Sequence, residues 1–232
     1  MDLIWEGLRK ALELLLTLDP EVLRITLLSL EVSGLATLIS LVIGLGVAVP
    51  VALNEFPGKR LVIALLNTGM GLPPVVVGLF VTVLLWRNGP FGFLEILYTP
   101  TAMILAQAAI ASPIIAGISL SALQHLPPGL RLQILALGAS RPQMVWLLLK
   151  EARLPLLAAV MAGFGGVISE VGASIMVGGN IKGQTRVLTT ATVMETSKGN
   201  FEVAFALSIL LLVLAFAVNA VLTHVQQRNH SR

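Results

Sequence analysis

LGASRPQMVWLLLKEARLPLL, residues 137–157, is a charged stretch with helical periodicity that lies between long apolar runs. It belongs to a polar interruption that extends from Gln124 to Arg153. The segments on either side are apolar enough to cross a membrane, whereas the interruption must stay outside the hydrocarbon. A polar insertion of this length in a membrane protein predicts a segment that engages a partner.

The composition is that of an integral membrane protein. Of 232 residues, 56% are hydrophobic and 12% are charged, whereas soluble domains have about 25% charged residues. The net charge of +3 is explained by Lys and Arg that flank membrane segments. No clustered basic face is present, so we expect no nucleic-acid partner.

Several kinds of chemistry are disfavoured. The absence of cysteine excludes disulfides, thiolate metal sites and cysteine nucleophiles. His125, His224 and His230 lie at or beyond the ends of apolar runs and lack metal-ligand spacing. No Ser-His or paired-Asp constellation lies within the apolar runs, which disfavours an intramembrane protease. We therefore expect no catalytic residue, no metal site and no cofactor bound by this chain.

The hydrophobic pattern predicts an all-α, polytopic fold with five transmembrane helices. Residues 1–19 are expected to form an N-terminal amphipathic helix in the membrane interface. A permease-sized membrane domain follows over 20–225, and 226–232 form a cytoplasmic tail. The expected spans, each near the 20 residues that a crossing needs, cover roughly 24–53, 61–86, 100–123, 154–178 and 202–224.

The distribution of Lys and Arg sets the expected orientation. The 54–60 link, the 124–153 loop and the C-terminus would carry eight basic residues against seven on the other side, or against four once the N-terminal arm is set aside. We therefore place these three segments in the cytoplasm and the N-terminus outside. No internal repeat is evident, which disfavours a secondary ion-coupled transporter built from inverted repeats.

The cytoplasmic loop has the pattern of two short helices. Pro127-Pro128-Gly129 breaks the preceding helix, and small residues at 138–140 separate two helical stretches. Such a hairpin either seals the bundle or presents a docking surface. The segment resembles the coupling motif of ABC-importer permeases, the loop that docks into an ATPase subunit. The resemblance implies docking residues Ala136, Gly138, Ala139, Ser140, Arg141 and Met144.

This loop departs from the family motif in two places. The motif has Glu-Ala-Ala, three residues, Gly, and then Leu-Pro, but Leu132, Gln133 and Ile134 occupy the Glu-Ala-Ala positions here. Leu154-Pro155 also follows about one helical turn later than usual. The contact that the family's Glu makes is therefore not carried over to this chain.

A second resemblance covers SEVGASIMVGGNIKGQTRVLTTATVMETSKGNF, residues 169–201. Permeases for tungstate, molybdate and sulfate share a similar pattern, which is matched here at Glu170, Gly172, Ala173, Gly179, Asn180, Ile181, Gly183, Thr185 and Leu188. Leu72-Pro73-Pro74 resembles the Leu-Pro-Pro element of the same permeases. Thr189 and the segment from Glu195 to Phe201 look most like the tungstate branch, and the resemblance implies the type I ABC-importer permease fold.

Two expected spans contain helix breakers. Gly and Pro at 69–74 interrupt the second span, and glycines and serines are frequent in the fourth. Broken helices are tolerated in a membrane where they line a cavity or pack on protein, and small residues also permit plain helix packing. Both interpretations stay open for the candidate pore or gate residues Pro73, Pro74, Ser169, Glu170, Gly172, Ala173 and Ser174.

Glu170 lies within an apolar run, where placing a carboxylate in the membrane is energetically unfavourable. Because it would repel an anionic cargo, we expect it to bond to the backbone or to a basic residue near a hinge. Direct cargo binding is not expected.

The resemblance implies the transmembrane subunit of an oxyanion importer in the cell membrane, with tungstate as the first expectation and molybdate or sulfate next. It also implies a second copy of the chain, two ATP-binding subunits that hold ATP and Mg, and an extracytoplasmic oxyanion-binding protein. Membrane lipid would surround the spans. A secondary ion-coupled transporter remains the alternative from another class.

Overall fold

The computed structural model describes residues 5–7, 9–10, 12–13 and 19–228. The expected N-terminal helix over 1–19 therefore lies partly outside the described residues, as do residues 229–232 of the expected tail. Residues 5–7, 9–10 and 12–13 are helical. Asp19 starts the next helix rather than continuing the first, because its Oδ1 accepts hydrogen bonds from the amides of Glu21 and Val22.

The described chain is all-helical apart from turns and loops, as the hydrophobic pattern predicts. Its elements are α2 (Pro20–Leu53), α3 (Lys59–Met70), α4 (Pro74–Leu85), the 3₁₀ turn η1 (Gly92–Leu94), α5 (Pro100–Gln124), α6 (Leu130–Ala136), α7 (Arg141–Glu151), α8 (Arg153–Ile168), α9 (Gly172–Gly178), α10 (Leu188–Ser197) and α11 (Phe201–Arg228). The short helix α10 between the fourth and fifth apolar runs is not anticipated by the sequence.

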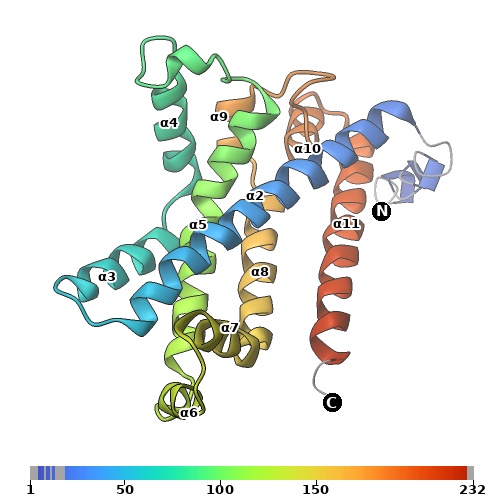
Figure 1. The fold of residues 1–232 in the computed structure, drawn as a ribbon. Helices are drawn as coiled ribbons and strands as arrows, with labels where there is room; N and C mark the ends of the chain where they lie inside the picture. Colours follow the sequence, from blue (N-terminus) through green and yellow to red (C-terminus); the bar gives the residue numbers. More distant parts are fainter. Residues whose placement is uncertain (1–4, 8, 11, 14–18, 229–232) are drawn as a thin grey trace.

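Within the described residues, three single helices are long and apolar enough to cross a membrane: α2, α5 and α11. Two further crossings are possible if each bent pair, α3 with α4 and α8 with α9, counts as one span. At about 1.5 Å per residue, the 34 residues of α2 extend about 51 Å, well beyond the roughly 30 Å of hydrocarbon. Accordingly, α2 runs obliquely across the bundle (Figure 1).

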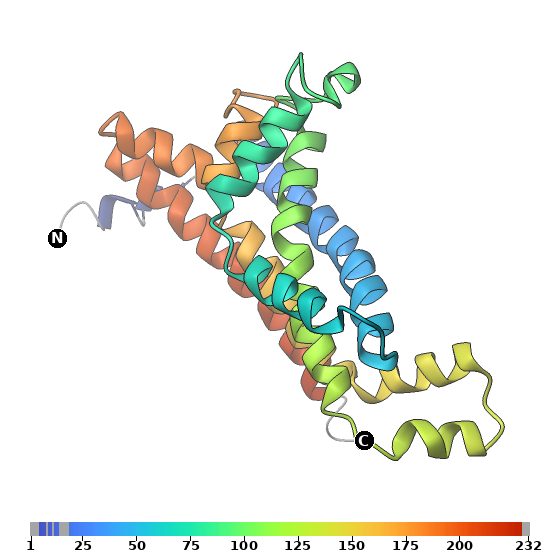
Figure 2. The same cartoon turned by 90° about the vertical axis from the view of Figure 1, so that its left-hand side faces the viewer.

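Helix α5 forms the centre of the bundle and contacts α2, α3, α4, α8 and α9. It is the most buried of the three long helices, and α11 is the least. Figure 2 places α6, α7 and the C-terminal end of α11 at one end of the molecule and the 86–99 and 179–187 loops at the other. We call these the hairpin end and the loop end.

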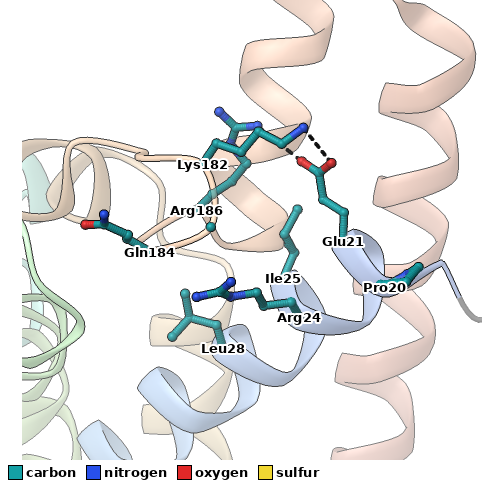
Figure 3. A pocket seen from close by; sticks show the side chains of 9 residues that line it. Pro20, Glu21, Arg24, Ile25, Leu28, Lys182, Gln184 and Arg186 are labelled. Atoms are coloured by element: carbon teal, nitrogen blue, oxygen red, sulfur yellow. Dashed lines mark ion pairs between the residues drawn. The ribbon is translucent and has the colours of Figure 1, made fainter.

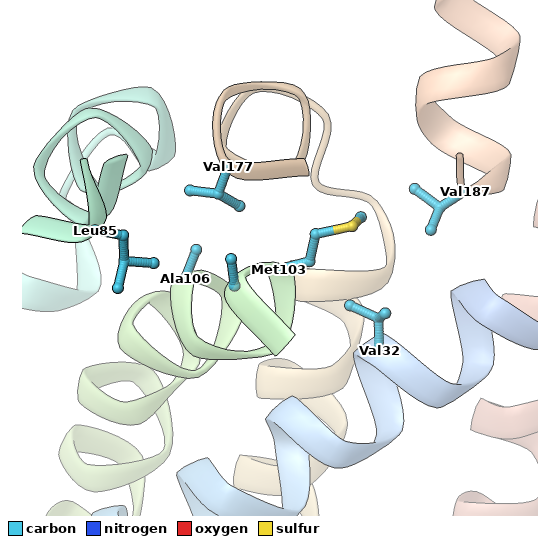
Figure 4. Packing of buried hydrophobic residues seen from close by; sticks show 7 residues of the cluster. Val32, Leu85, Met103, Ala106, Val177 and Val187 are labelled. Atoms are coloured by element: carbon cyan, nitrogen blue, oxygen red, sulfur yellow. The ribbon is translucent and has the colours of Figure 1, made fainter. Parts of the chain in front are cut away.

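A hydrophobic cluster at the loop end joins four helices (Figure 4). Val32 of α2, Leu85 of α4, Met103 of α5 and Val177 of α9 are buried together in it. Relative to exposure to water, burying one such side chain is worth about 1.5–3 kcal/mol. Between helices that already lie in lipid, the attraction comes instead from close packing. This cluster fixes α4 and α9, one helix of each bent pair, against α5.

Candidate functional site

The first candidate region is the pair of helix breaks. Helix α3 ends at Met70 and α4 begins at Pro74, with the two axes bent by 103°. Pro74 occupies the first turn of α4. Backbone N–H groups in the first turn have no acceptor within the helix, so the missing N–H of proline costs no hydrogen bond there. Gly71, Leu72 and Pro73 therefore form the break that the Gly and Pro pattern predicts, and that part of the prediction is confirmed.

The second break separates α8 from α9, which are bent by 61°. Ser169 ends α8, and its Oγ donates to the carbonyl of Gly165 at 2.8 Å. Glu170 follows, and its Oε1 accepts a hydrogen bond of 2.9 Å from the amide of Ala173. The carbonyl of Glu170 accepts another, of 3.0 Å, from the hydroxyl of Thr189.

Glu170 thus supports the break and satisfies a free amide in the first turn of α9. A carboxylate at this position is favoured because the first amides of a helix have no intrahelical acceptor. The expectation that Glu170 bonds to the backbone near a hinge is confirmed. The link to Thr189 connects the same break to α10, which the sequence pattern does not reveal.

Helix α9 packs very closely on α4. A Cβ placed on Gly78 would lie 2.6 Å from Cα of Ala173, and one placed on Gly172 would lie 2.5 Å from Cγ2 of Val75. Both separations are shorter than van der Waals contact, so each glycine is needed for the present packing. On its other side, α9 is joined to α5 through a hydrogen bond of 3.2 Å from Nε2 of Gln107 to Oγ of Ser174.

The predicted gate residues therefore lie in different environments. Pro73 and Ser169 are exposed, Pro74, Glu170 and Gly172 are partly buried, and Ala173 and Ser174 are buried between helices. The structure brings Gly172, Ala173 and Ser174 together on α9 against α4 and α5, and it leaves Pro73 at the other break. Whether any of them lines a passage stays a prediction. Sequence reasoning missed Gln107, which is buried in the same contact. The available signal was a lone Gln within an apolar run.

The second candidate region is the hairpin of α6 and α7. The turn between them includes Gly138, whose φ of +85° lies in the left-handed region that glycine adopts without steric cost. Helix α7 then starts at Arg141-Pro142, and the amide of Ser140 donates to Oε1 of Gln143 at 2.8 Å. The expected break between two helical stretches at 138–140 is confirmed.

The hairpin has a core of its own. Met144 and Leu148 of α7, Ile134 of α6 and Leu123 of α5 are buried together, with Leu53 of α2 packed against them. In addition, the guanidinium of Arg131 donates to the carbonyl of Leu53 at 2.5 Å. The hairpin is therefore packed directly against the C-terminal ends of α2 and α5.

Met144 holds the hairpin together from inside, since its side chain is only 3% exposed. Of the other predicted docking residues, Ala136, Gly138, Ser140 and Arg141 are exposed and Ala139 is partly buried. The surface also contains large apolar side chains that sequence reasoning missed as docking candidates. Leu137 is 88% exposed, Leu132 is 70% exposed and Trp146 is 68% exposed.

Large contiguous patches of exposed apolar side chains mark interaction surfaces, so these three side chains are further docking candidates. Leu137 precedes the turn glycine directly, and a Cβ on Gly138 would meet no atom within 4 Å. The tip of the hairpin is thus apolar and open. Within the part of the chain that the structure describes, no group of three or more His, Cys, Asp or Glu could hold a metal ion.

Comparison with known proteins places the chain among transport proteins. The family model described as "Binding-protein-dependent transport system inner membrane component" matches residues 40–231. The chain is 41% identical over 227 residues to the tungstate uptake system permease protein TupB of Peptoclostridium acidaminophilum, covering 98% of this chain and 100% of that protein. It is 42% identical to a probable anion ABC transporter permease protein of Haloferax volcanii, covering 90% and 92% of the two chains.

The molybdenum transport system permease protein ModB of Escherichia coli is more distant, at 29% identity over 92% of this chain and 98% of that one. Among solved structures, the inward-facing MetNI methionine ABC transporter gives a TM-score of 0.74 at 22% identity, with 90% of this chain and 98% of that chain covered. The fold is therefore that of type I ABC-importer permeases.

Proposed function

This chain belongs to the family of binding-protein-dependent transport system inner membrane components, and on this premise we propose that its cargo is tungstate. It is a permease subunit of an ABC importer, as its relatives of nearly full length are. The observation that supports the cargo is the 41% identity to a tungstate permease along 98% of the chain. The molybdenum permease reaches only 29% over a similar length.

We propose a crossing count of five, with each bent pair as one span and the N-terminus outside. The hairpin end, which holds Arg131 of α6 and Arg153 at the start of α8, would then be cytoplasmic, as the charge pattern predicts. The apolar surfaces of α2 and α11, such as Leu38 and Phe216, face lipid or a second copy of the chain. A homodimer would place two hairpins side by side on two ATP-binding subunits.

The hairpin end explains how ATP hydrolysis on those partners would act on this chain. An ATPase surface that receives Leu137 and the open backbone at Gly138 would pull on the hairpin core. Because Ile134 and Met144 pack with Leu123 of α5, that pull reaches the central helix and through it α9. ATP and Mg would be bound by the partner, and an extracytoplasmic binding protein would deliver the oxyanion at the loop end.

Uptake in proteoliposomes tests the cargo. The permease is reconstituted with its ATPase and binding protein, and ATP-dependent accumulation of tungstate is measured against molybdate and sulfate as competitors. We expect tungstate to accumulate and to be displaced least effectively by sulfate. Equal or faster accumulation of molybdate would remove tungstate as the cargo.

Docking is tested separately with Leu137→Ser, which changes an 88% exposed side chain and removes no internal contact. We expect less ATPase to co-purify with this variant. Phe93→Ser is the matched control, because Phe93 is 78% exposed in the loop at the other end. Normal co-purification with Leu137→Ser would mean that the hairpin tip does not contact the ATPase.

A further inference from the structure

A cavity of about 250 Å³ lies at the loop end, where α2 begins, and none of its lining residues was assigned to either candidate region (Figure 3). Its wall is mostly apolar and includes Ile25 and Leu28 of α2. Arg24 of the same helix and Lys182 and Arg186 of the 179–187 loop stand around it. The cavity thus combines an apolar wall with three cationic side chains.

The cations exceed the carboxylates available to them. Within the part of the chain that the structure describes, Glu21 alone forms ion pairs with this group, through Oε2 at 2.7 Å from Nζ of Lys182 and Oε1 at 3.6 Å from Nη1 of Arg186. Among the described residues, Arg24 forms no ion pair, and the buried Nε of Arg186 has no hydrogen-bond partner. The cluster can therefore accept another anionic group with several oxygens.

The neighbouring carboxylates bond to other groups, although the charge of Glu195 also interacts with Arg186. Glu195 accepts a bond of 2.8 Å from Lys198 and one of 2.7 Å from Asn200. Asp19 caps the first turn of α2 through its Oδ1. An anion entering the cavity would therefore compete with Glu21 for Lys182 and Arg186, and with Glu195 for Arg186.

The position of the cavity selects the source of the anion. Arg24 lies at the start of the longest apolar helix, and the next exposed side chain on its outer surface is Leu27, at 64% exposure. Basic residues at the ends of apolar spans reach the level of the lipid headgroups. A free oxyanion would gain nothing from the wall formed by Ile25 and Leu28, whereas an acyl chain would.

We propose that this cavity binds an anionic phospholipid, with the phosphate on Arg24, Lys182 and Arg186 and the start of an acyl chain against Ile25 and Leu28. The bound headgroup would bridge the first span to the loop that leaves α9. The site is independent of the cargo. Its chemistry, a tetrahedral oxyanion group among three cations, is shared with free phosphate and tungstate, so the experiment must separate lipid from free ion.

The permease–ATPase complex is purified in a maltoside detergent, and phosphatidylglycerol or phosphatidylcholine is titrated into it. Native mass spectrometry counts the lipids retained, and the melting temperature is followed in parallel. We expect phosphatidylglycerol to be retained in preference to phosphatidylcholine. Since each basic residue near a membrane surface is worth about a fivefold change in affinity, Arg24→Gln should weaken retention about fivefold.

Arg24→Lys keeps the charge and should retain most of the lipid. Arg87→Gln is the matched control, because it removes one exposed cation at the same end outside this cavity, and it should leave retention unchanged. Equal phosphatidylglycerol retention by wild type and Arg24→Gln would overturn the proposal. Stabilisation by inorganic phosphate or tungstate, lost in Arg24→Gln and without any phosphatidylglycerol effect, would also overturn it and assign the cavity to a free oxyanion.

Discussion

The side-chain amide of Gln107 on α5 donates a hydrogen bond of 3.2 Å to the hydroxyl of Ser174 on α9, and both residues are at least 98% buried. Oε1 of Gln107 has no partner among the described atoms. This bond connects the central helix α5 to α9, the shorter helix of the bent pair α8 and α9. The two partners are not equivalent, because the Gln107 amide also carries Oε1, which is buried and lacks a partner in the described chain.

Removal of either partner should therefore have unequal effects. Ser174→Ala leaves the buried amide of Gln107 without its acceptor and should destabilise the protein by about 1–3 kcal/mol. Gln107→Leu removes the unpaired oxygen together with the donor and should cost less. Melting temperatures of the detergent-solubilised variants test this order. A larger loss in Gln107→Leu than in Ser174→Ala would show that the bond is not the dominant interaction at this contact.

The size of the side chain tolerated at position 172 should be limited by contact with Val75. Gly172→Leu should reduce stability as well as transport, because a Cβ on Gly172 would lie 2.5 Å from Cγ2 of Val75. For the smaller change Gly172→Ala we expect a loss of about 1–3 kcal/mol from overpacking. Adding Val75→Ala should restore most of the melting temperature.

The double variant also separates packing from a pore role. If Gly172→Ala with Val75→Ala melts normally and takes up oxyanion normally, Gly172 serves only to pack α9 on α4. Normal melting with impaired uptake would support a position on the passage. Val75→Ala alone is the control, since Val75 is 53% exposed and its truncation should change little.

At Gly138, backbone strain and docking can be distinguished. The φ of +85° is tolerated by Asn far better than by a β-branched residue. Gly138→Asn should therefore keep the hairpin folded while adding bulk at the open tip, whereas Gly138→Val should also disturb the turn. We expect both to reduce ATPase co-purification, with Gly138→Val also lowering the melting temperature. Unchanged co-purification with Gly138→Asn would mean that no close approach occurs at this residue.

The proposed five-span topology places Ser140 and Ser197 on opposite sides of the membrane. The chain has no native cysteine, and both serines are exposed, so single cysteines there report without background. An impermeant maleimide added to intact cells should label Ser197→Cys and should label Ser140→Cys only after the membrane is opened. Labelling of both from outside would contradict the topology.

Glu195 should make stability depend on pH. Hydrogen bonds from Asn200, followed by those from Lys198, hold the pKa of Glu195 below its ordinary value of 4.5. A lowered folded-state pKa stabilises the protein above the unfolded-state pKa, and this contribution is lost as the pH falls through the folded-state value. Glu195→Gln should reduce the fall in melting temperature below about pH 4.5. An unchanged acid profile in this variant would show that the ion pair does not contribute.

The sequence by itself determined the class of the protein and most of its elements. Apolar runs separated by polar links specify membrane helices, because lipid leaves no other way to satisfy the backbone. Pro73 and Pro74, which follow Gly71 and Leu72, likewise favour the break before α4, since proline in a helix interior removes a hydrogen bond and clashes with the preceding turn. The turn at Gly138 and the backbone bonding of Glu170 were predictable for the same kind of local reason.

The tertiary structure alone decided which surfaces meet. Whether Met144 faces a partner or the hairpin core depends on α5 and α2, which are distant in the sequence and supply Leu123 and Leu53. Gln107 becomes a contact to α9 only because α5 is central, and Arg24 joins Lys182 only because the 179–187 loop returns to the start of α2. An apolar helix in lipid shows little periodic signal for the side that faces protein, since lipid and protein interior are equally apolar. Packing between segments far apart in the chain therefore had to supply that information.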